Sequence, residues 1–138
     1  MITLHQARTL VAAAEAKADD LGIAVNIAIL DGGGHLKAFS RMDGAVLGSI
    51  DVATRKATTA VLFNTRSEAI WEYCKPGAPA PGLELTNGGL APFGGGIPLH
   101  DSRTNLVGAV GVSGGTVAQD VEIASAAVAA FIAKQETT

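Results

Sequence analysis

The fold is decided by one stretch of sequence, Ile23–Arg41, which reads IAVNIAILDGGGHLKAFSR. Over 23–30, bulky apolar side chains alternate with small or polar ones, and this period is typical of a β-strand. The turn Asp31–Gly34 follows, because Asp-Gly and Gly-Gly steps tolerate the positive φ angles of tight hairpins. A return strand over 35–41 completes the pattern. The stretch therefore predicts a β-hairpin with one strongly apolar face.

Helices are predicted before and after this hairpin. Apolar residues recur at spacings of three and four, which places them on one face of a helix. This pattern and the capping signals predict helices over 4–21, 49–62, 66–74 and 117–131. Capping-box pairs mark three of the helix starts: Thr3 with Gln6, Thr65 with Glu68, and Thr116 with Gln119.

The second half of the chain contains another hairpin pattern. Prolines and glycines over 75–92 predict a long irregular loop, with a short strand near 83–85. Strand patterns over 97–100 and 105–112, joined by a polar turn, predict the second hairpin. The order helix-hairpin-helix-helix-loop-hairpin-helix therefore predicts an α+β fold, in which helices pack on one antiparallel sheet.

Composition narrows the class of protein. The chain has 138 residues, of which 48% are hydrophobic, and a formal net charge of −3. These values predict one ordered domain over 1–138 and exclude a mainly disordered chain. A pI near 5.5 argues against a nucleic-acid partner, and the single cysteine, Cys74, cannot form a disulfide within the chain. Because no signal-peptide pattern or bilayer-length apolar run is present, we expect a cytoplasmic protein without a membrane partner.

A glycine triplet and two basic residues are the strongest candidates for recognising an anion. Gly94, Gly95 and Gly96 follow the long loop, and their consecutive N–H groups can form an anion-binding nest. Lys56 lies one position off the apolar stripe of its helix, and Arg41 ends a strand. Either side chain near such a nest would bind a carboxylate or phosphate. The alternatives are that the glycines let the chain pass a packed helix and that the basic side chains cover apolar surface.

Other candidate residues carry weaker signals. Ser113, within GVSGG at 111–115, only faintly resembles a G-x-S-x-G nucleophile elbow, so we expect a ligand contact there rather than a hydrolase. The three histidines, His5, His35 and His100, show no paired ligand spacing, and we therefore expect no metal site. A single histidine is enough for an axial ligand to haem. The alternative for each histidine is a surface or capping role.

Several motifs together resemble one protein family. They read ILDGGGHL, FSRMDGA, KATTA, GGGIPL and GAVGVSGG, and they lie at 29–36, 39–45, 56–60, 94–99 and 108–115. As a set they resemble the GlcG/HbpS family of haem-binding-like proteins, also found as the C-terminal domain of PduO-type corrinoid adenosyltransferases. The resemblance implies an α+β fold with a central antiparallel sheet of about five strands. It also implies haem or another tetrapyrrole as ligand, and a homo-oligomer in which dimers assemble into larger rings or octamers.

Two functions follow from these residues and this resemblance. In the first, a cytoplasmic oligomer binds haem or a related anionic small molecule. Family histidine ligands lie near the N-terminal helix, which makes His5 the candidate axial ligand by position, with Arg41 or Lys56 meeting the propionates. In the second, the chain is an enzyme or enzyme accessory in the catabolism of an organic acid, whose carboxylate the nest, Lys56 and Arg41 hold. The candidates for moving a proton are Asp31, Glu84 and His100.

The sequence leaves both functions open, together with a third in which the chain is a structural oligomer without a ligand of its own.

Overall fold

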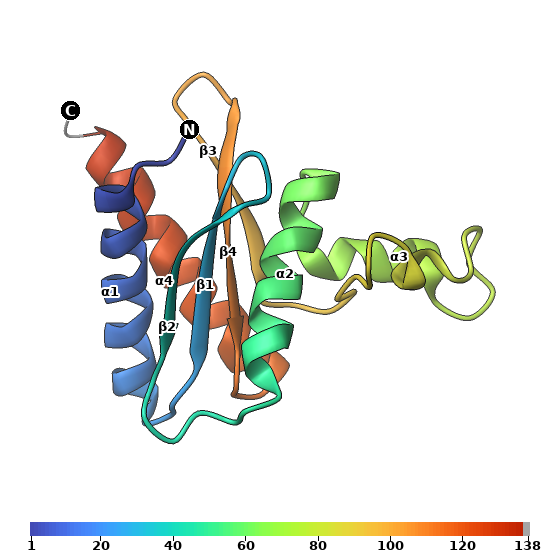
Figure 1. The fold of residues 1–138 in the computed structure, drawn as a ribbon, viewed down its shortest axis with the longest axis horizontal. Helices are drawn as coiled ribbons and strands as arrows, with labels where there is room; N and C mark the ends of the chain where they lie inside the picture. The colour runs from blue at the N-terminus through green and yellow to red at the C-terminus, as the bar shows by residue number, and fades with distance from the viewer. Residues whose placement is uncertain (137–138) are drawn as a thin grey trace.

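The computed structural model describes residues 1–136 and has three layers, with one sheet between two layers of helices (Figure 1). The sheet contains β1 (Asn26–Asp31), β2 (Leu36–Arg41), β3 (Gly96–His100) and β4 (Leu106–Ser113). The strand order is β2-β1-β4-β3, and each neighbouring pair is antiparallel. The two hairpins therefore meet at the centre of the sheet, where β1 pairs with β4.

The helices divide unequally between the two faces of the sheet. α1 (Leu4–Leu21) and α4 (Val117–Glu136) pack together on one face, whereas α2 (Ser49–Phe63) covers the other (Figure 1). Because side chains alternate along a strand, Ile27 joins the core under α1 and α4, and Ala28 joins the core under α2. Among residues 1–136, none of the helices combines the length and apolar character that a membrane span requires.

The layer under α2 is thin because its residues are small. Gly111 of β4 leaves no side chain between helix and strand, since a Cβ there would lie 2.0 Å from the carbonyl oxygen of Ala53. Alanines form most of the remaining contact: Ala28, Ala53, Ala57, Ala60 and Ala109. The backbone of α2 consequently packs directly against the sheet.

Between α2 and β3 the chain leaves this body as an arm, defined here as residues 64–95 (Figure 1). The arm contains a 3-10 helix, η1 (Ser67–Ile70), the short helix α3 (Trp71–Cys74) and a second 3-10 turn, η2 (Leu83–Leu85). It has a small core of its own, formed by Ile70, Cys74 and Leu90. Three of the six aromatic side chains of the protein lie on the arm: Trp71, Tyr73 and Phe93.

The predicted α+β fold and element order are confirmed, with two corrections. Within residues 1–136 the sheet has four strands rather than about five, and 83–85 forms the turn η2 rather than a strand. Thr65 and Glu68 form no capping box, because Glu68 pairs with Arg66 at 2.6 Å and the segment begins as a 3-10 helix. The other two predicted capping boxes are confirmed.

Candidate functional site

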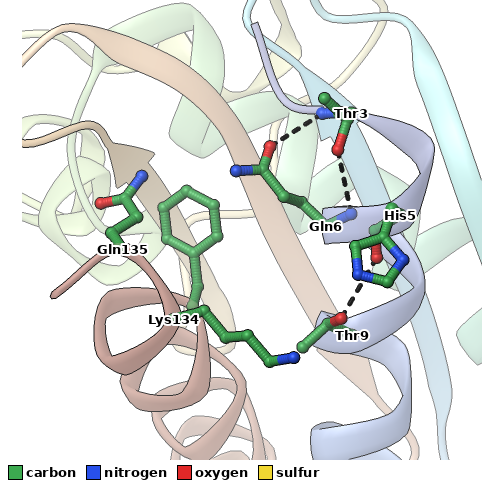
Figure 2. A pocket seen from close by; sticks show the side chains of 7 residues that line it. Thr3, His5, Gln6, Thr9, Lys134 and Gln135 are labelled. Atoms are coloured by element: carbon green, nitrogen blue, oxygen red, sulfur yellow. Dashed lines mark hydrogen bonds between the residues drawn. The ribbon is translucent and has the colours of Figure 1, made fainter. Parts of the chain in front are cut away.

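A groove opens between the start of α1 and the end of α4 (Figure 2). Its volume is about 460 Å³, which is within the range of small-molecule sites. Its walls are formed by Thr3, His5, Gln6, Thr9, Phe131, Lys134 and Gln135. One aromatic ring thus lies beside polar and cationic side chains, a mixture that suits a largely apolar ligand with acidic groups.

The capping box at the start of α1 fixes one wall of the groove. Oγ1 of Thr3 accepts a hydrogen bond from the N–H of Gln6 at 3.1 Å, and Oε1 of Gln6 accepts one from the N–H of Thr3 at 2.9 Å. The hydroxyl of Thr9 donates to the carbonyl oxygen of His5 at 3.2 Å. The first two bonds satisfy N–H groups that a helix start leaves unpaired. The side chains on this wall therefore project from a well-held first turn.

His5, the predicted axial ligand, lies in this groove. Figure 2 shows it on the first turn of α1, with the side chain of Lys134 reaching across from α4 towards Thr9. Within residues 1–136, neither ring nitrogen of His5 has a hydrogen-bond partner. An imidazole nitrogen that is not engaged elsewhere is able to ligate a metal ion. Phe131 and Lys134 were not predicted, because they come from the opposite end of the chain.

Lys56 lies on the other side of the sheet, where its ammonium group already has partners. Nζ donates to the carbonyl oxygen of Val112 at 2.8 Å and to Oδ2 of Asp120 at 3.0 Å, and it lies 5.3 Å from the centre of the Phe93 ring. Lys56 is 1% exposed, and burial lowers the pKa of its ammonium group although Asp120 opposes that shift. Oδ1 of Asp120 accepts the N–H of Gly115 at 2.9 Å. The pair thereby ties α2, β4 and α4 together.

The glycine triplet passes directly over Lys56. A Cβ at Gly95 would lie 2.7 Å from Nζ of Lys56, and one at Gly96 would lie 2.2 Å from the Lys56 carbonyl oxygen. A Cβ at Gly94 would collide with a side chain of α4, and the N–H of Gly96 donates to Oγ of Ser67 at 2.9 Å. This geometry matches the alternative in which glycines let the chain pass a packed helix. Ligand binding by Lys56 and the triplet stays a prediction, and it requires this packing to open.

The structure brings two other predicted ligand contacts into one row across the sheet. Arg41 and Ser113 both pair with Asn26, one on each side of β1, and directly opposed residues share a face of the sheet. Arg41 ends the edge strand β2, and it also lines a groove with Glu15 and Asp19 of α1. Asn26 is fully buried, and its Nδ2 donates to the carbonyl oxygen of Val46 at 3.1 Å. Its Oδ1 has no partner among the described residues, which is costly for a buried acceptor. The signal that could have indicated this row was a polar residue inside an otherwise apolar strand.

The three candidates for moving a proton come from three different segments of the chain. Asp31 is in the β1–β2 turn, where its Oδ1 accepts the N–H of His35 at 3.0 Å, and this bond is the main cause that lowers the pKa of Asp31. His100 ends β3, with Nε2 at 2.7 Å from Oδ1 of Asn64. Glu84 lies on the arm. Over 1–136, no three His, Cys, Asp or Glu side chains are arranged to hold a metal ion.

Comparisons with known proteins identify relatives over nearly the whole chain. The family model described as haem degrading protein HbpS-like matches residues 2–129. A 15.0 kDa protein of Citrobacter freundii from the dhaT-dhaS intergenic region is 40% identical over 131 residues, covering 94% of this chain and 92% of that protein. The corrinoid adenosyltransferase PduO of Salmonella typhimurium is 37% identical over 131 residues. That match covers 94% of this chain but 39% of the adenosyltransferase.

A solved structure of a relative has the same architecture. The crystal structure of the PduOC:heme complex superposes with a TM-score of 0.89 at 37% sequence identity, and the match covers 94% of each chain. The family model and the sequence identity above 30% extend over most of this chain. The resemblance to the GlcG/HbpS family is thus confirmed, and the chain belongs to the family described as haem degrading protein HbpS-like.

Proposed function

We propose that this protein binds haem, or a closely related tetrapyrrole, in the groove between α1 and α4, with His5 as the axial ligand. The observation that carries the proposal is the position of His5. It lines a groove of about 460 Å³, and its ring makes no hydrogen bond within residues 1–136. The relative PduOC, solved as a complex with heme, supports the class of ligand. When bound, haem supplies redox and ligand-binding chemistry at its iron.

The lining residues fit such a ligand. Phe131 contributes an apolar wall, and Lys134 contributes a cation that suits an acidic substituent. Arg41 and Lys56, which the sequence offered for this contact, are too far from His5. Lys56 belongs to α2, on the opposite face of the sheet, and Arg41 lines a groove with Asp19, near the far end of α1. A helix of 18 residues is about 27 Å long. We therefore assign the contact with the propionates to Lys134.

Hemin titration of the purified full chain tests this function. Wild type should give a saturable Soret shift, which His5→Ala should abolish. His35→Ala is the matched control, because His35 lies in the exposed β1–β2 turn outside the groove. No shift in wild type at micromolar hemin would overturn haem binding. Equal binding by wild type and His5→Ala would overturn the axial role alone.

The proposal includes a cytoplasmic location and the assembly that the resemblance implies, a homo-oligomer in which dimers assemble into larger rings or octamers. The exposed aromatic side chains of the arm support assembly, since such rings are enriched in protein interfaces. Light scattering on the full chain measures the mass, and a single species of 13.9 kDa would overturn the oligomer. Cell fractionation tests the location.

A second candidate function is recognition of a small organic acid by the row of Arg41, Asn26 and Ser113. Arg41 forms no hydrogen bond or ion pair within the described residues, and a guanidinium group can bind a carboxylate through two parallel hydrogen bonds. The unpaired Oδ1 of Asn26 would accept a hydroxyl of the same ligand. A hydroxy acid from a test panel should therefore raise the melting temperature of wild type but not of Arg41→Gln. Equal shifts of the melting temperature in both proteins, or no shift in either, would overturn this second function.

A further inference from the structure

One turn of the arm has a chemically labile sequence. The segment Thr86–Gly89 reads TNGG, and we call it the Asn87 turn. The N–H of Gly89 donates to the carbonyl oxygen of Thr86 at 2.9 Å, which closes a four-residue turn. Asn87 and Gly88 have φ angles of +55° and +75°, a combination typical of an Asn-Gly type I′ turn. Both residues are exposed, so water reaches the side-chain amide of Asn87.

The backbone nitrogen of Gly88 is available to attack the side chain of Asn87. Within residues 1–136, the N–H of Gly88 donates to no acceptor. Gly88 has no side chain to hinder approach to this nitrogen, and two successive glycines permit the backbone rotation that ring closure requires. The Asn87 amide is held only at the surface, where Nδ2 donates to Oγ1 of Thr86 at 3.1 Å. The turn therefore presents both reacting groups to each other and to solvent.

The other three asparagines of the chain are better protected from this reaction. Asn26 is fully buried on β1. Asn64 and Asn105 are followed by Thr65 and Leu106, whose branched side chains hinder attack by the next backbone nitrogen. These asparagines therefore serve as internal references for Asn87.

Arg55 of α2 holds the Asn87 turn against the helix. Its Nη1 donates to the carbonyl oxygens of Gly88 and Gly89, the latter at 3.1 Å. Its Nε donates to Oδ2 of Asp51, one helical turn earlier, at 2.9 Å, which orients the guanidinium group. A Cβ at Gly89 would lie 3.3 Å from Nη1 of Arg55, so the turn and the side chain are in close contact. The positions of the two carbonyl groups thus decide whether this contact is kept.

We infer that Asn87 is a site of spontaneous deamidation, and that the isoaspartate formed there releases the Asn87 turn from α2. The backbone nitrogen of Gly88 loses its proton and bonds to the side-chain carbonyl carbon of Asn87. The bond from that carbon to Nδ2 breaks, and ammonia leaves. Water then opens the cyclic imide at either of its carbonyl groups, which gives aspartate or isoaspartate. The inference does not depend on haem binding, because the turn lies on the arm, outside the groove that His5 lines.

The two products differ in their effect on the turn. Both add one negative charge, but only isoaspartate carries the main chain through the former side chain and so inserts a methylene group before Gly88. The longer backbone cannot keep the hydrogen bond from Gly89 to Thr86 together with the two carbonyl contacts to Arg55. Aspartate leaves the backbone unchanged, and it tolerates the positive φ that this position requires. The release is therefore a property of the isoaspartate product.

Ageing the purified full chain at mildly alkaline pH tests the modification site. Peptide mapping by mass spectrometry measures deamidation at each asparagine, and a protein isoaspartate methyltransferase labels the isoaspartate product. Deamidation of Asn87 should be at least about tenfold faster than that of Asn64 or Asn105. In Asn87→Gln the labelling should fall to background, because the longer side chain closes a less favourable ring. Equal rates at the three asparagines would overturn the site.

Hydrogen exchange measured by NMR before and after ageing tests the release. The N–H of Gly89 should exchange at least about tenfold faster in the isoaspartate form, because its bond to Thr86 is lost. The N–H of Ala91, which donates to Oγ1 of Thr59 at 3.0 Å, is the internal reference. Asn87→Asp is the matched control, since it adds the same charge to an unchanged backbone, and it should keep the slow exchange of Gly89. Unchanged exchange of Gly89 in the isoaspartate form, or equally fast exchange in Asn87→Asp, would overturn the release by isoaspartate.

Discussion

Replacing Asp120 by Asn should destabilise the protein strongly, because it leaves the ammonium group of Lys56 buried without a counter-charge. Asn keeps the shape of the side chain and an oxygen for the N–H of Gly115, but Lys56 is only 1% exposed. Breaking a buried ion pair from one side costs about 3–5 kcal/mol. An unfolding entropy of about 2.1 cal/mol/K per residue gives about 0.3 kcal/mol/K for 138 residues. The Tm should therefore fall by roughly 10–17 °C.

The stability that Asp120→Asn loses should depend on pH in a defined direction. Burial already lowers the pKa of Lys56 below its ordinary value of 10.5, and the loss of Asp120 should lower it further. Between the folded pKa and 10.5 the unfolded chain binds more protons than the folded one, so stability rises with pH. The pH range over which stability rises with pH should therefore extend to lower pH in Asp120→Asn. Denaturant unfolding at a series of pH values measures both effects.

Glu122→Gln is the matched control for this prediction. It removes a carboxylate from the same helix, but the Glu122 pair with Lys17 is solvent-exposed and longer, at 3.7 Å. Such a pair contributes less than about 1 kcal/mol. An Asp120→Asn variant that loses no more stability than Glu122→Gln would refute the buried pair. So would a stability–pH profile of Asp120→Asn that has the same shape as that of wild type between neutral pH and 10.5.

Three further predictions follow from the fold. Gly111→Ala should reduce the free energy of unfolding by about 3 kcal/mol or more, since its Cβ would meet the backbone of α2. Gly48→Ala, where a Cβ meets nothing within 4 Å, should change it by less than about 0.5 kcal/mol, and similar losses in both would contradict the close packing. Thr3→Ala should cost about 1 kcal/mol in thermal unfolding, because a capping box is lost, and an unchanged Tm would argue against that cap. The pKa of Asp31 is lowered, so its contribution to stability is present above pH 3.8 and is lost as the pH falls through the folded pKa. An acid titration of Asp31→Asn should show a smaller loss than wild type, and an identical acid profile would count against the turn hydrogen bonds.

Local periodicity predicted most of the elements, because each depends on residues that are close in the sequence. The first hairpin and the cap at Thr3 are examples. The count of about five strands, which the resemblance implied, was wrong, because the described residues form a sheet of four strands and 83–85 adds none. The alternation of Leu83, Glu84 and Leu85 is typical of a strand, but Gly82 has a φ of +88°, and the chain closes into a 3-10 turn there.

The candidate sites were harder to predict, because their parts are distant in the sequence. His5 was identifiable by position, but its neighbours Phe131 and Lys134 lie near the other end of the chain. Lys56 and Asp120 were each recognisable as charged residues in apolar surroundings. Their contact depends on the packing of α2 and α4 around β4, which no local pattern records.

The junction of β1 with β4 affects how the chain reaches its fold. Each hairpin forms between neighbours, whereas this junction pairs Ile27 with Val112, across most of the chain. Such a large loop closes late, because entropy is lost before the new contacts compensate. Until then, two strands destined for the centre of the sheet have unpaired edges, which are templates for aggregation. The chain should therefore be most prone to misassembly during synthesis, before β4 has emerged to cover β1.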